Sequence, residues 1–476
     1  MKFIKESGPH IKSNDTTSKI MTRLLIALIP IISFAIFKNT ILVYFFTSAS
    51  FMTVIHPILM ILVGILTSYI SEFLWFKLIL KNSFKISCLE LYRSFSIIPG
   101  LLLALVLPIN TPIWVVAFGA FCGTIIGKML YGGFGQNIFN PALIGYLFIS
   151  VSYNSLLGTP LNTYELDTLA GATPLTNLVK LNYFGTYKAI VGEYGSLLNF
   201  FSGTIPGAIG EVSKLLILIS FIYLVITKTI KWRIPTTYIL TVFLLASIIG
   251  YSIGLGMWYP LFHILSGGLL FGAVFMATDP VTSPVTPIGQ VIHGISLGIL
   301  TVVIRFLTPY PEGVMTSILF MNMFVPLFDK IGVKLKYNFK KVYIPIVTFL
   351  IITILLVISI VTNINNNKTG NIDDVGNKVI ITDTKKEGNK TIYNVSSKGW
   401  GLIKAEVEVV DKRIKSIIIT DKSGETQWNE LEKENYIYKV ITNQDDIDKL
   451  DAISGSTYSS DALKNIVKKV LSEELK

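Results

Sequence analysis

Long apolar runs separated by short polar connections occupy the chain up to about Val361. A helix needs about 20 mainly apolar residues to cross about 30 Å of hydrocarbon. Eleven runs approach that length: Met21–Phe37, Val54–Leu80, Phe95–Ile109, Ile113–Tyr131, Ile138–Val151, Leu215–Ile230, Ile234–Leu255, Trp258–Ala277, Ile288–Phe306, Val314–Phe328 and Val342–Val361. The pattern predicts an α-helical polytopic membrane protein of about ten helices plus one further helix.

After the last run the pattern changes. Residues 363–389 are polar and rich in Gly and Asn, which is typical of a linker with at most one strand. AEVEVV and IKSIIIT, separated by DKR, alternate or run β-branched as in a hairpin, and a helical pattern with Ser459 or Ser460 as N-cap closes the chain. We therefore expect a membrane domain over 1–341, an additional transmembrane helix over 342–362, a linker over 363–389 and a small α+β domain over 390–476.

Basic residues predict the orientation. A cytoplasmic N-terminus places most of them in the inner connections: Lys77, Lys81, Lys85, Arg93, Lys128, Lys228, Lys231, Arg233, Lys330, Lys334, Lys336, Lys340 and Lys341. The outer side then keeps little beyond Lys38 and Arg305. The excess of positive charge inside favours this topology, with the loop at about 152–213 and the C-terminal domain extracytoplasmic. The first run lacks a cleavage site after it, so we expect it to remain as an anchor.

Composition supports the membrane location and excludes several functions. The chain is 51% hydrophobic and only 15% charged, and its net charge of +11 lies largely in the inner connections. Membrane lipid explains this charge, so a nucleic-acid partner is not needed. Cys88 and Cys122 are expected too far apart to bridge, an iron–sulfur cluster normally takes four ligands, and the four His residues are scattered. We therefore expect no metal site in this chain.

The membrane part shows an internal duplication. The stretch from Pro99 to Pro108 is similar to the stretch from Gly267 to Pro280, and the two lie five spans apart. An odd spacing predicts inverted repeats, although chance similarity between Leu/Gly-rich segments is the alternative. YGGFGQNIFNPA and ATDPVTSPVTP interrupt equivalent spans, and the second contains Asp279. An acid at this depth is a candidate for an ion path, or else it caps a broken helix.

Two short stretches share one pattern. DTLAGATPL begins at Asp167 and DAISGSTYSS begins at Asp451, and both fall on the expected outer face. In the second, Gly455 permits a tight turn, Ser456 is small, and Thr457 lies at a predicted helix start, where a phosphate is stabilised. A plain capping turn explains the same residues.

Several motifs carry a resemblance to a known family. The membrane part resembles the RnfD-type membrane component of the Rnf electron-transport complex and its NqrB-type relative in the sodium-pumping NADH:quinone oxidoreductase. The resemblance lies in SGPHIKSNDTTSKIM, GLLLALVLP, LYGGFGQNIFNPALIGY, GATPL, HILSGGLLFGAVFMATDPVT and PYPEGV. The tail resembles the FMN-binding domain of the RnfG-type component of the same complex through GWGLIKAEV and DAISGSTYSS.

The resemblance implies where flavin is attached. These families bind FMN covalently through its phosphate to the last residue of a D-x-x-[ST]-G-A-[ST] signal. The implied FMN-binding residues are Thr173 and Thr457, together with Asp167, Gly171, Ala172, Asp451, Ser454, Gly455 and Ser456. Ala170 and Ser456 depart from the pattern, and GETQW replaces a longer family stretch, which leaves Trp400 and Trp428 as candidate contacts to the isoalloxazine ring. Riboflavin is a further cofactor that we consider.

The sequence thus favours a flavin-carrying electron-transfer subunit of an Rnf-like complex that couples ferredoxin:NAD⁺ electron transfer to Na⁺ or H⁺ translocation. Its expected partners are other membrane and iron–sulfur subunits and a flavin transferase for maturation. The alternatives are a flavinylated conduit that passes electrons outward without pumping, and a flavin or small-solute transporter. The pattern does not identify the coupling ion or the direct electron donor and acceptor.

Overall fold

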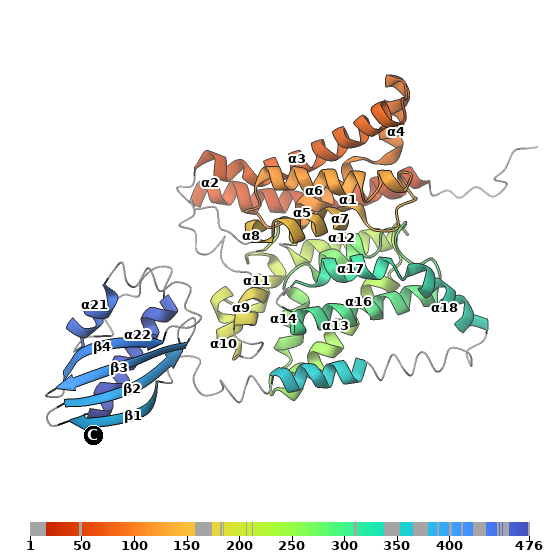
Figure 1. Cartoon of the computed structure of the whole chain (residues 1–476). Helices are drawn as coiled ribbons and strands as arrows, with labels where there is room; N and C mark the ends of the chain where they lie inside the picture. Colours follow the sequence, from red (N-terminus) through yellow and green to blue (C-terminus); the bar gives the residue numbers. More distant parts are fainter. Residues whose placement is uncertain are drawn as a thin grey trace, which may run out of the picture. The chain divides into compact units, whose positions relative to one another are not determined.

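The computed structural model describes residues 16–46, 50–157, 174–180, 183, 185–205, 207–211, 213–308, 312–337, 353–364, 379–387, 390–398, 402–410, 413–421, 435–444, 447, 450 and 457–474. The chain divides into two units, residues 1–367 and 368–476 (Figure 1). Each unit is described by itself.

The first unit is helical. Its first half contains α1 (Thr17–Ile36), η1 (Phe37–Leu42), α2 (Val43–Phe46), α3 (Phe51–Leu74), η2 (Trp75–Ile79), α4 (Phe84–Ser94), α5 (Ile97–Val106), α6 (Ile113–Ile125), η3 (Met129–Tyr131) and α7 (Pro141–Ser152). Short helices follow: α8 (Asn154–Leu157), α9 (Pro174–Lys180), α10 (Tyr187–Ile190), η4 (Gly192–Tyr194), α11 (Leu197–Ser202) and η5 (Ile209–Glu211). The second half contains α12 (Lys214–Ile226), α13 (Arg233–Ser252), α14 (Trp258–Leu265), α15 (Leu269–Phe271), η6 (Gly272–Met276), α16 (Pro287–Leu307), α17 (Val314–Asn322) and α18 (Val325–Tyr337).

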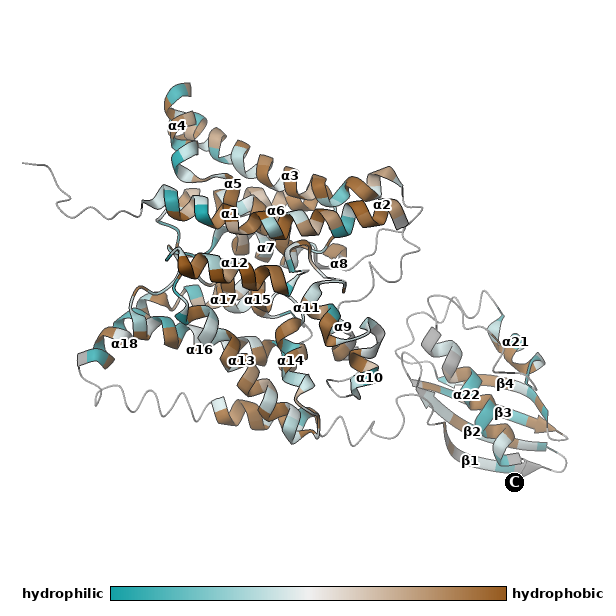
Figure 2. Ribbon diagram, turned by 180° about the vertical axis from the view of Figure 1, so that it is seen from behind, coloured by the Kyte–Doolittle hydropathy of each residue, from teal (hydrophilic) through white to brown (hydrophobic). Residues whose placement is uncertain are grey.

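These helices agree with the first ten apolar runs and confirm a polytopic membrane fold. Of the eleventh run, the structure describes only the part from Thr353 onward. Within the described residues, five helices are long and apolar enough to span a membrane, and three bent pairs qualify as broken spans. Three shorter apolar helices cover Pro141–Ser152, Lys214–Ile226 and Thr353–Ile364. Figure 2 shows hydrophobic residues along most of these helices, and especially along α12.

The two halves repeat one order of elements. Each has a leading helix (α1 or α12), a long helix (α3 or α13), a bent pair, a further long helix (α6 or α16) and a last helix (α7 or α17). The bend is 46° between α4 and α5, and 63° between α14 and the α15–η6 segment. The residues of both half-helices, from Leu101 to Val106 and from Leu269 to Met276, lie in the buried core. The broken spans therefore form the centre of the unit.

The half-helices run in opposite directions, as the odd repeat spacing predicted. The C-terminal end of α5 meets η5, where the Ile209 amide donates to the Leu107 carbonyl, and the N-terminal end of α15 packs against the same η5. At their other ends, Pro99 of α5 and Phe275 of η6 line one cavity. The C-terminal end of α5 and the N-terminal end of α15 thus lie beside the same element, and the opposite ends of the two half-helices line the same cavity. The half-helices are therefore antiparallel, which is the geometry of inverted repeats.

Small residues allow the central helices to approach closely. A Cβ on Gly100 of α5 would overlap the carbonyl oxygen of Gly64 on α3, and Gly145 of α7 meets the backbone of Gly119 on α6 in the same way. Membrane helices associate through such small-residue contacts because lipid supplies no hydrophobic driving force between them.

The second unit is an α+β domain. Its antiparallel sheet has the order β1 (Ile380–Glu387), β2 (Lys390–Lys398), β3 (Leu402–Val410) and β4 (Arg413–Asp421). The helices are α21 (Tyr436–Thr442) and α22 (Thr457–Glu474), and α22 packs on β2 and β4. Ile403, Ala405, Val407 and Val409 are buried on one sheet face, because alternate residues of a strand face the same side.

Two expected boundaries in this unit need correction. The predicted β3–β4 hairpin is confirmed, but β1 lies inside the predicted linker and pairs with β2, so the sheet begins ahead of Lys390. The closing helix begins at Thr457, so neither Ser459 nor Ser460 is its N-cap; both are buried inside α22. Buried hydroxyl groups within a helix cannot be distinguished from caps by residue type alone.

Candidate functional site

The expected flavin residues fall mostly outside the described part of the chain. This holds for Asp167, Gly171, Ala172, Thr173, Asp451, Ser454, Gly455, Ser456, Trp400 and Trp428. Thr457 is placed as the first residue of the 18-residue helix α22. The start of a long helix offers backbone N–H groups to an anion, so this position fits an FMN phosphate.

The first signal also leads into a helix. Helix α9 begins at Pro174, directly after Thr173, and Pro is well suited to a first helical position because that N–H has no helical partner. Leu175 and Leu178 of this short helix are 2% and 1% exposed and belong to the membrane core. The segment that follows Thr173 is thus anchored in the first unit.

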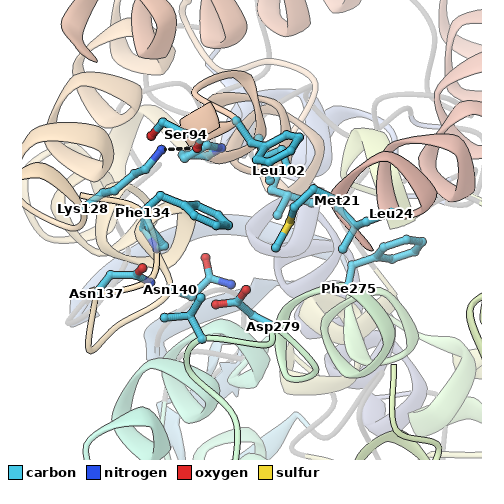
Figure 3. A pocket seen from close by; sticks show the side chains of 15 residues that line it. Met21, Leu24, Ser94, Leu102, Lys128, Phe134, Asn137, Asn140, Phe275 and Asp279 are labelled. Atoms are coloured by element: carbon cyan, nitrogen blue, oxygen red, sulfur yellow. Dashed lines mark hydrogen bonds between the residues drawn. The ribbon is translucent and has the colours of Figure 1, made fainter. Parts of the chain in front are cut away.

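A cavity lies between the two repeats, at the N-terminal end of α5 and the C-terminal end of η6 (Figure 3). Its volume is about 50 Å³, and its wall combines apolar side chains with Ser94, Lys128, Asn137, Asn140 and Asp279. A space of this size holds water or a small cation. A riboflavin ring would require the lining side chains to move.

Asp279 lies in the wall of this cavity, shortly after η6. Its Oδ2 atom accepts a hydrogen bond from Thr282 Oγ1 at 2.9 Å, and its carboxylate also accepts from the backbone N–H groups of Val281 and Thr282. Asp279 therefore caps the turn that follows the broken helix, as one of the two sequence interpretations predicts. The same carboxylate faces the cavity, so the cap does not remove it from a path for ions (Figure 3).

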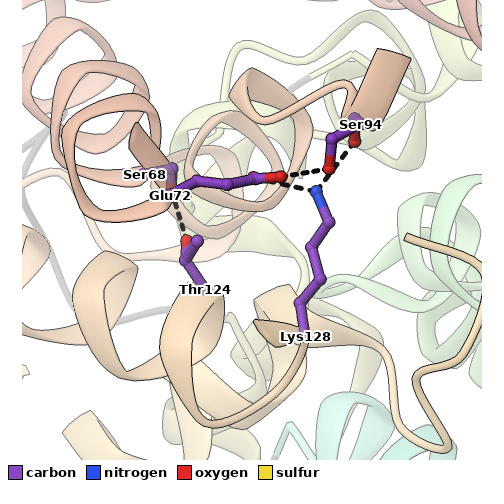
Figure 4. Close-up of polar contacts among 5 residues, drawn as sticks. All are labelled: Ser68, Glu72, Ser94, Thr124 and Lys128. Carbon is purple, nitrogen blue, oxygen red and sulfur yellow. Dashed lines mark hydrogen bonds and ion pairs between the residues drawn. The ribbon is translucent and has the colours of Figure 1, made fainter. Parts of the chain in front are cut away.

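A buried ion pair borders the same cavity (Figure 4). Lys128 Nζ lies 3.0 Å from Glu72 Oε2 and donates to the Ser94 carbonyl at 2.8 Å, while the Ser94 hydroxyl donates to Glu72 Oε1. The Glu72 and Lys128 side chains are 0% and 3% exposed. The pair ties α3 and the segment after α6 to the break between α4 and α5.

Burial of three basic residues changes how the charge pattern is interpreted. Lys128 is expected from the sequence to be an inner-loop charge, but it is buried, and so are the two outer exceptions, Lys38 and Arg305. Lys38 Nζ donates to the Ile205 carbonyl, and Arg305 donates to the His263 carbonyl at 2.6 Å. Each of these three side chains therefore donates a hydrogen bond to a backbone carbonyl inside the protein. The predicted orientation rests on the remaining basic residues.

Three further buried charges, Glu72, Glu211 and Lys214, are not among the residues that the sequence pattern indicated. Glu72 lies inside an apolar run and Lys214 directly before one, and a charge at such a position is a signal that could have found them. Among the described residues, no group of three or more His, Cys, Asp or Glu side chains is placed to hold a metal ion. His263 and His293 are 1% and 0% exposed and pack against aromatic rings, as expected for structural residues.

The antiparallel broken helices, the buried charges beside them and the appended α+β unit define a polytopic membrane protein of the inverted-repeat type. Residues 4–338 match the NQR2, RnfD, RnfE family, and residues 399–472 match the FMN-binding domain. The chain belongs to the NQR2, RnfD, RnfE family and carries a C-terminal FMN-binding domain.

Named relatives come from two kinds of complex. The chain is 36% identical to the D component of the proton-translocating ferredoxin:NAD(+) oxidoreductase complex of Clostridium ljungdahlii, over 71% of this chain and 97% of the relative. It is 34% identical to the D component of the Na(+)-translocating ferredoxin:NAD(+) oxidoreductase complex of Acetobacterium woodii, over 71% and 95%. The B component of the Na(+)-translocating NADH-quinone reductase of Klebsiella pneumoniae is 35% identical, over 51% and 60%.

Proposed function

We propose that the chain is an electron-transfer subunit of an Rnf-like membrane complex and holds two FMN groups, bound as phosphoesters of Thr173 and Thr457. The complex couples ferredoxin:NAD⁺ electron transfer to the translocation of Na⁺ or H⁺. The main support is that one chain contains both the family's membrane domain and an FMN-binding domain whose signal leads directly into α22.

The protein's own part in this function is to position the two flavins. The start of α22 stabilises the negative charge of a phosphate on Thr457, and Leu175 and Leu178 fix the segment that follows Thr173. Bound FMN supplies the electron-transfer chemistry. Joining the FMN-binding domain to the membrane domain raises the effective concentration of one flavin near the other, so their encounter does not depend on subunit assembly.

Asp279 is the proposed ion-path residue, because its carboxylate faces a cavity between antiparallel half-helices. The D components of a proton-translocating complex and of an Na(+)-translocating complex are 36% and 34% identical to this chain, so the proposal includes both ions. The N-terminus is cytoplasmic and the FMN-binding domain extracytoplasmic in this proposal. Other membrane and iron–sulfur subunits, and a flavin transferase, are its partners.

The second candidate function is a conduit that passes electrons to an extracytoplasmic acceptor without pumping. It is favoured by the attached FMN-binding domain, which supplies an electron carrier without a separate subunit. The remaining alternative, a flavin or small-solute transporter, requires that neither Thr carries flavin.

Denaturing electrophoresis tests the flavin attachment. The full chain produced together with a flavin transferase should remain fluorescent, and Thr173→Val and Thr457→Val should each lose about half of the signal. The double variant should lose all of it, because Val keeps the β-branched shape but lacks the ester oxygen. Thr420→Val, on β4, is the matched control and should keep full fluorescence.

Proteolysis distinguishes the two positions. Cleavage between residues 364 and 379 should release one flavin with the FMN-binding domain and leave the other with the membrane domain. If neither fragment carries the additional mass of FMN, the attachment is refuted and the transporter is favoured.

A further inference from the structure

A second buried cluster of charged side chains lies at the other break, between α14 and α15. It draws on residues from separate elements: Glu211 of η5, Lys214 of α12, Arg305 of α16 and Glu312 just before α17. Glu211, Lys214 and Arg305 are 6%, 2% and 1% exposed. This cluster is separate from the cavity that contains Asp279, since none of its members lines that cavity.

The Lys214 ammonium is surrounded by oxygen atoms. Its Nζ donates to the carbonyl of Gly267 at 3.0 Å and to the carbonyl of Glu211. The Glu211 and Glu312 side chains both interact electrostatically with it. Carbonyl and carboxylate oxygens are the ligands that hard cations prefer. Carbonyls freed where a membrane helix breaks are a known way to coordinate Na⁺.

The two carboxylates meet at the break itself. Glu312 Oε2 accepts from the Gly268 N–H at 3.3 Å and occupies the space that a Cβ on Gly267 would need. Glu211 Oε1 occupies the corresponding space at Gly268. Both carboxylates can therefore lie against the backbone only because these two residues are Gly.

One further oxygen atom in the break is available. The Ser266 hydroxyl is fully buried and has no hydrogen-bond partner, although the Ser266 carbonyl accepts from Arg305 at 3.4 Å. A buried hydroxyl without a partner costs free energy unless something binds it. This atom points to a ligand that the protein side chains do not supply.

The cluster already holds a cation that Na⁺ can replace without a change in net charge. Glu211 and Glu312 supply carboxylate oxygens, Arg305 is always charged, and the Lys214 ammonium is the positive charge that lies among the carbonyl and carboxylate oxygens. From this geometry, we propose that the break between α14 and α15 is a cation-exchange site at which Na⁺ and the Lys214 ammonium compete for the same oxygens. The proposal rests on the proposed ion translocation and adds a second position to it.

The exchange step conserves charge. Lys214 gives up one proton to the outer aqueous phase and remains as a neutral amine, while one Na⁺ enters among the carbonyl and carboxylate oxygens. The charges of Glu211, Glu312 and Arg305 do not change in this step. Lys38 of η1 repels either cation, and Tyr146 of α7 lies near both carboxylates. Because each bound Na⁺ displaces one proton, the apparent Na⁺ affinity should become about tenfold weaker for each unit by which the pH falls.

Proton release measures this exchange without electron flow. The full chain, purified in detergent and depleted of Na⁺, is titrated with NaCl in weakly buffered solution that contains a pH indicator, with choline chloride as the reference salt. Wild type should release about one proton per bound Na⁺. Lys214→Met and Lys214→Arg should release none, because Met has no proton to lose and Arg keeps its proton.

Two variants secure the interpretation. Lys214→Arg retains a hydrogen-bonding cation and should fold even if Lys214→Met does not. Lys85→Met, at an exposed position of α4 away from the cluster, should still release the proton. No release from wild type, or equal release from Lys214→Arg, would overturn the exchange site. Loss of release only in Asp279→Asn would place the cation at the cavity that contains Asp279 and also overturn it. None of these results bears on flavin attachment, which the Thr→Val variants test separately.

Discussion

Replacing Lys128 with Met tests the buried ion pair at the break between α4 and α5. Lys128 Nζ makes a 3.0 Å contact with Glu72 Oε2 and a 2.8 Å hydrogen bond with the Ser94 carbonyl, and both side chains of the pair are at most 3% exposed. Lys128→Met leaves the Glu72 carboxylate buried with only the Ser94 hydroxyl as a partner. Removing one member of a buried ion pair destabilises a protein by about 3 to 5 kcal/mol.

That free energy corresponds to a loss of about a hundredfold or more in the folding equilibrium, since about 1.4 kcal/mol is a factor of ten. The double variant Lys128→Met/Glu72→Gln removes both charges and should regain most of the loss, because a buried pair replaced as a unit is often nearly neutral. The free energy of unfolding can be measured with the full chain in detergent micelles, by tryptophan fluorescence during denaturant titration.

Lys85→Met is the control, because Lys85 is an exposed residue of the neighbouring helix α4 and its loss should change the unfolding free energy little. The reasoning fails if Lys128→Met is as stable as the control. It also fails if the double variant is destabilised by the sum of the two single variants, because the residues would then act independently.

Three further predictions concern packing, ion movement and orientation. Gly100→Ala should destabilise the membrane domain, because its Cβ would overlap the Gly64 carbonyl, whereas Gly207→Ala should not, because that position is open; thermal unfolding in detergent compares them. Asp279→Asn should lower ion-coupled turnover of the assembled complex with flavin content unchanged, and normal ion movement would leave the carboxylate as a cap alone. A reporter fused after Lys476 should be active outside the cytoplasm and one inserted after Lys336 inside, and the opposite pattern would reject the orientation.

The membrane fold was accessible from the sequence because hydrocarbon imposes a simple rule on it. A spanning segment must be long, apolar and helical, so the eleven runs could be located one at a time without knowledge of their neighbours. The strands of the second unit were partly accessible for a similar reason, since alternation in AEVEVV reports one buried face. The edge strand β1 falls where the pattern allowed one strand within a linker, but its place in the sheet was not accessible, because it depends on pairing with β2.

The partners of the buried charges were decided by tertiary structure alone. Glu72 and Lys128 are far apart in sequence, and so are Lys214 and Gly267, yet each pair meets where a helix breaks. Each break exposes backbone carbonyls inside a low-dielectric core, and a charged side chain is stable there only if folding brings it to those oxygens. The sequence by itself therefore determined which segments span the membrane and where the spans are interrupted. The antiparallel packing of the repeats decided which charged side chains reach the backbone carbonyls at each interruption.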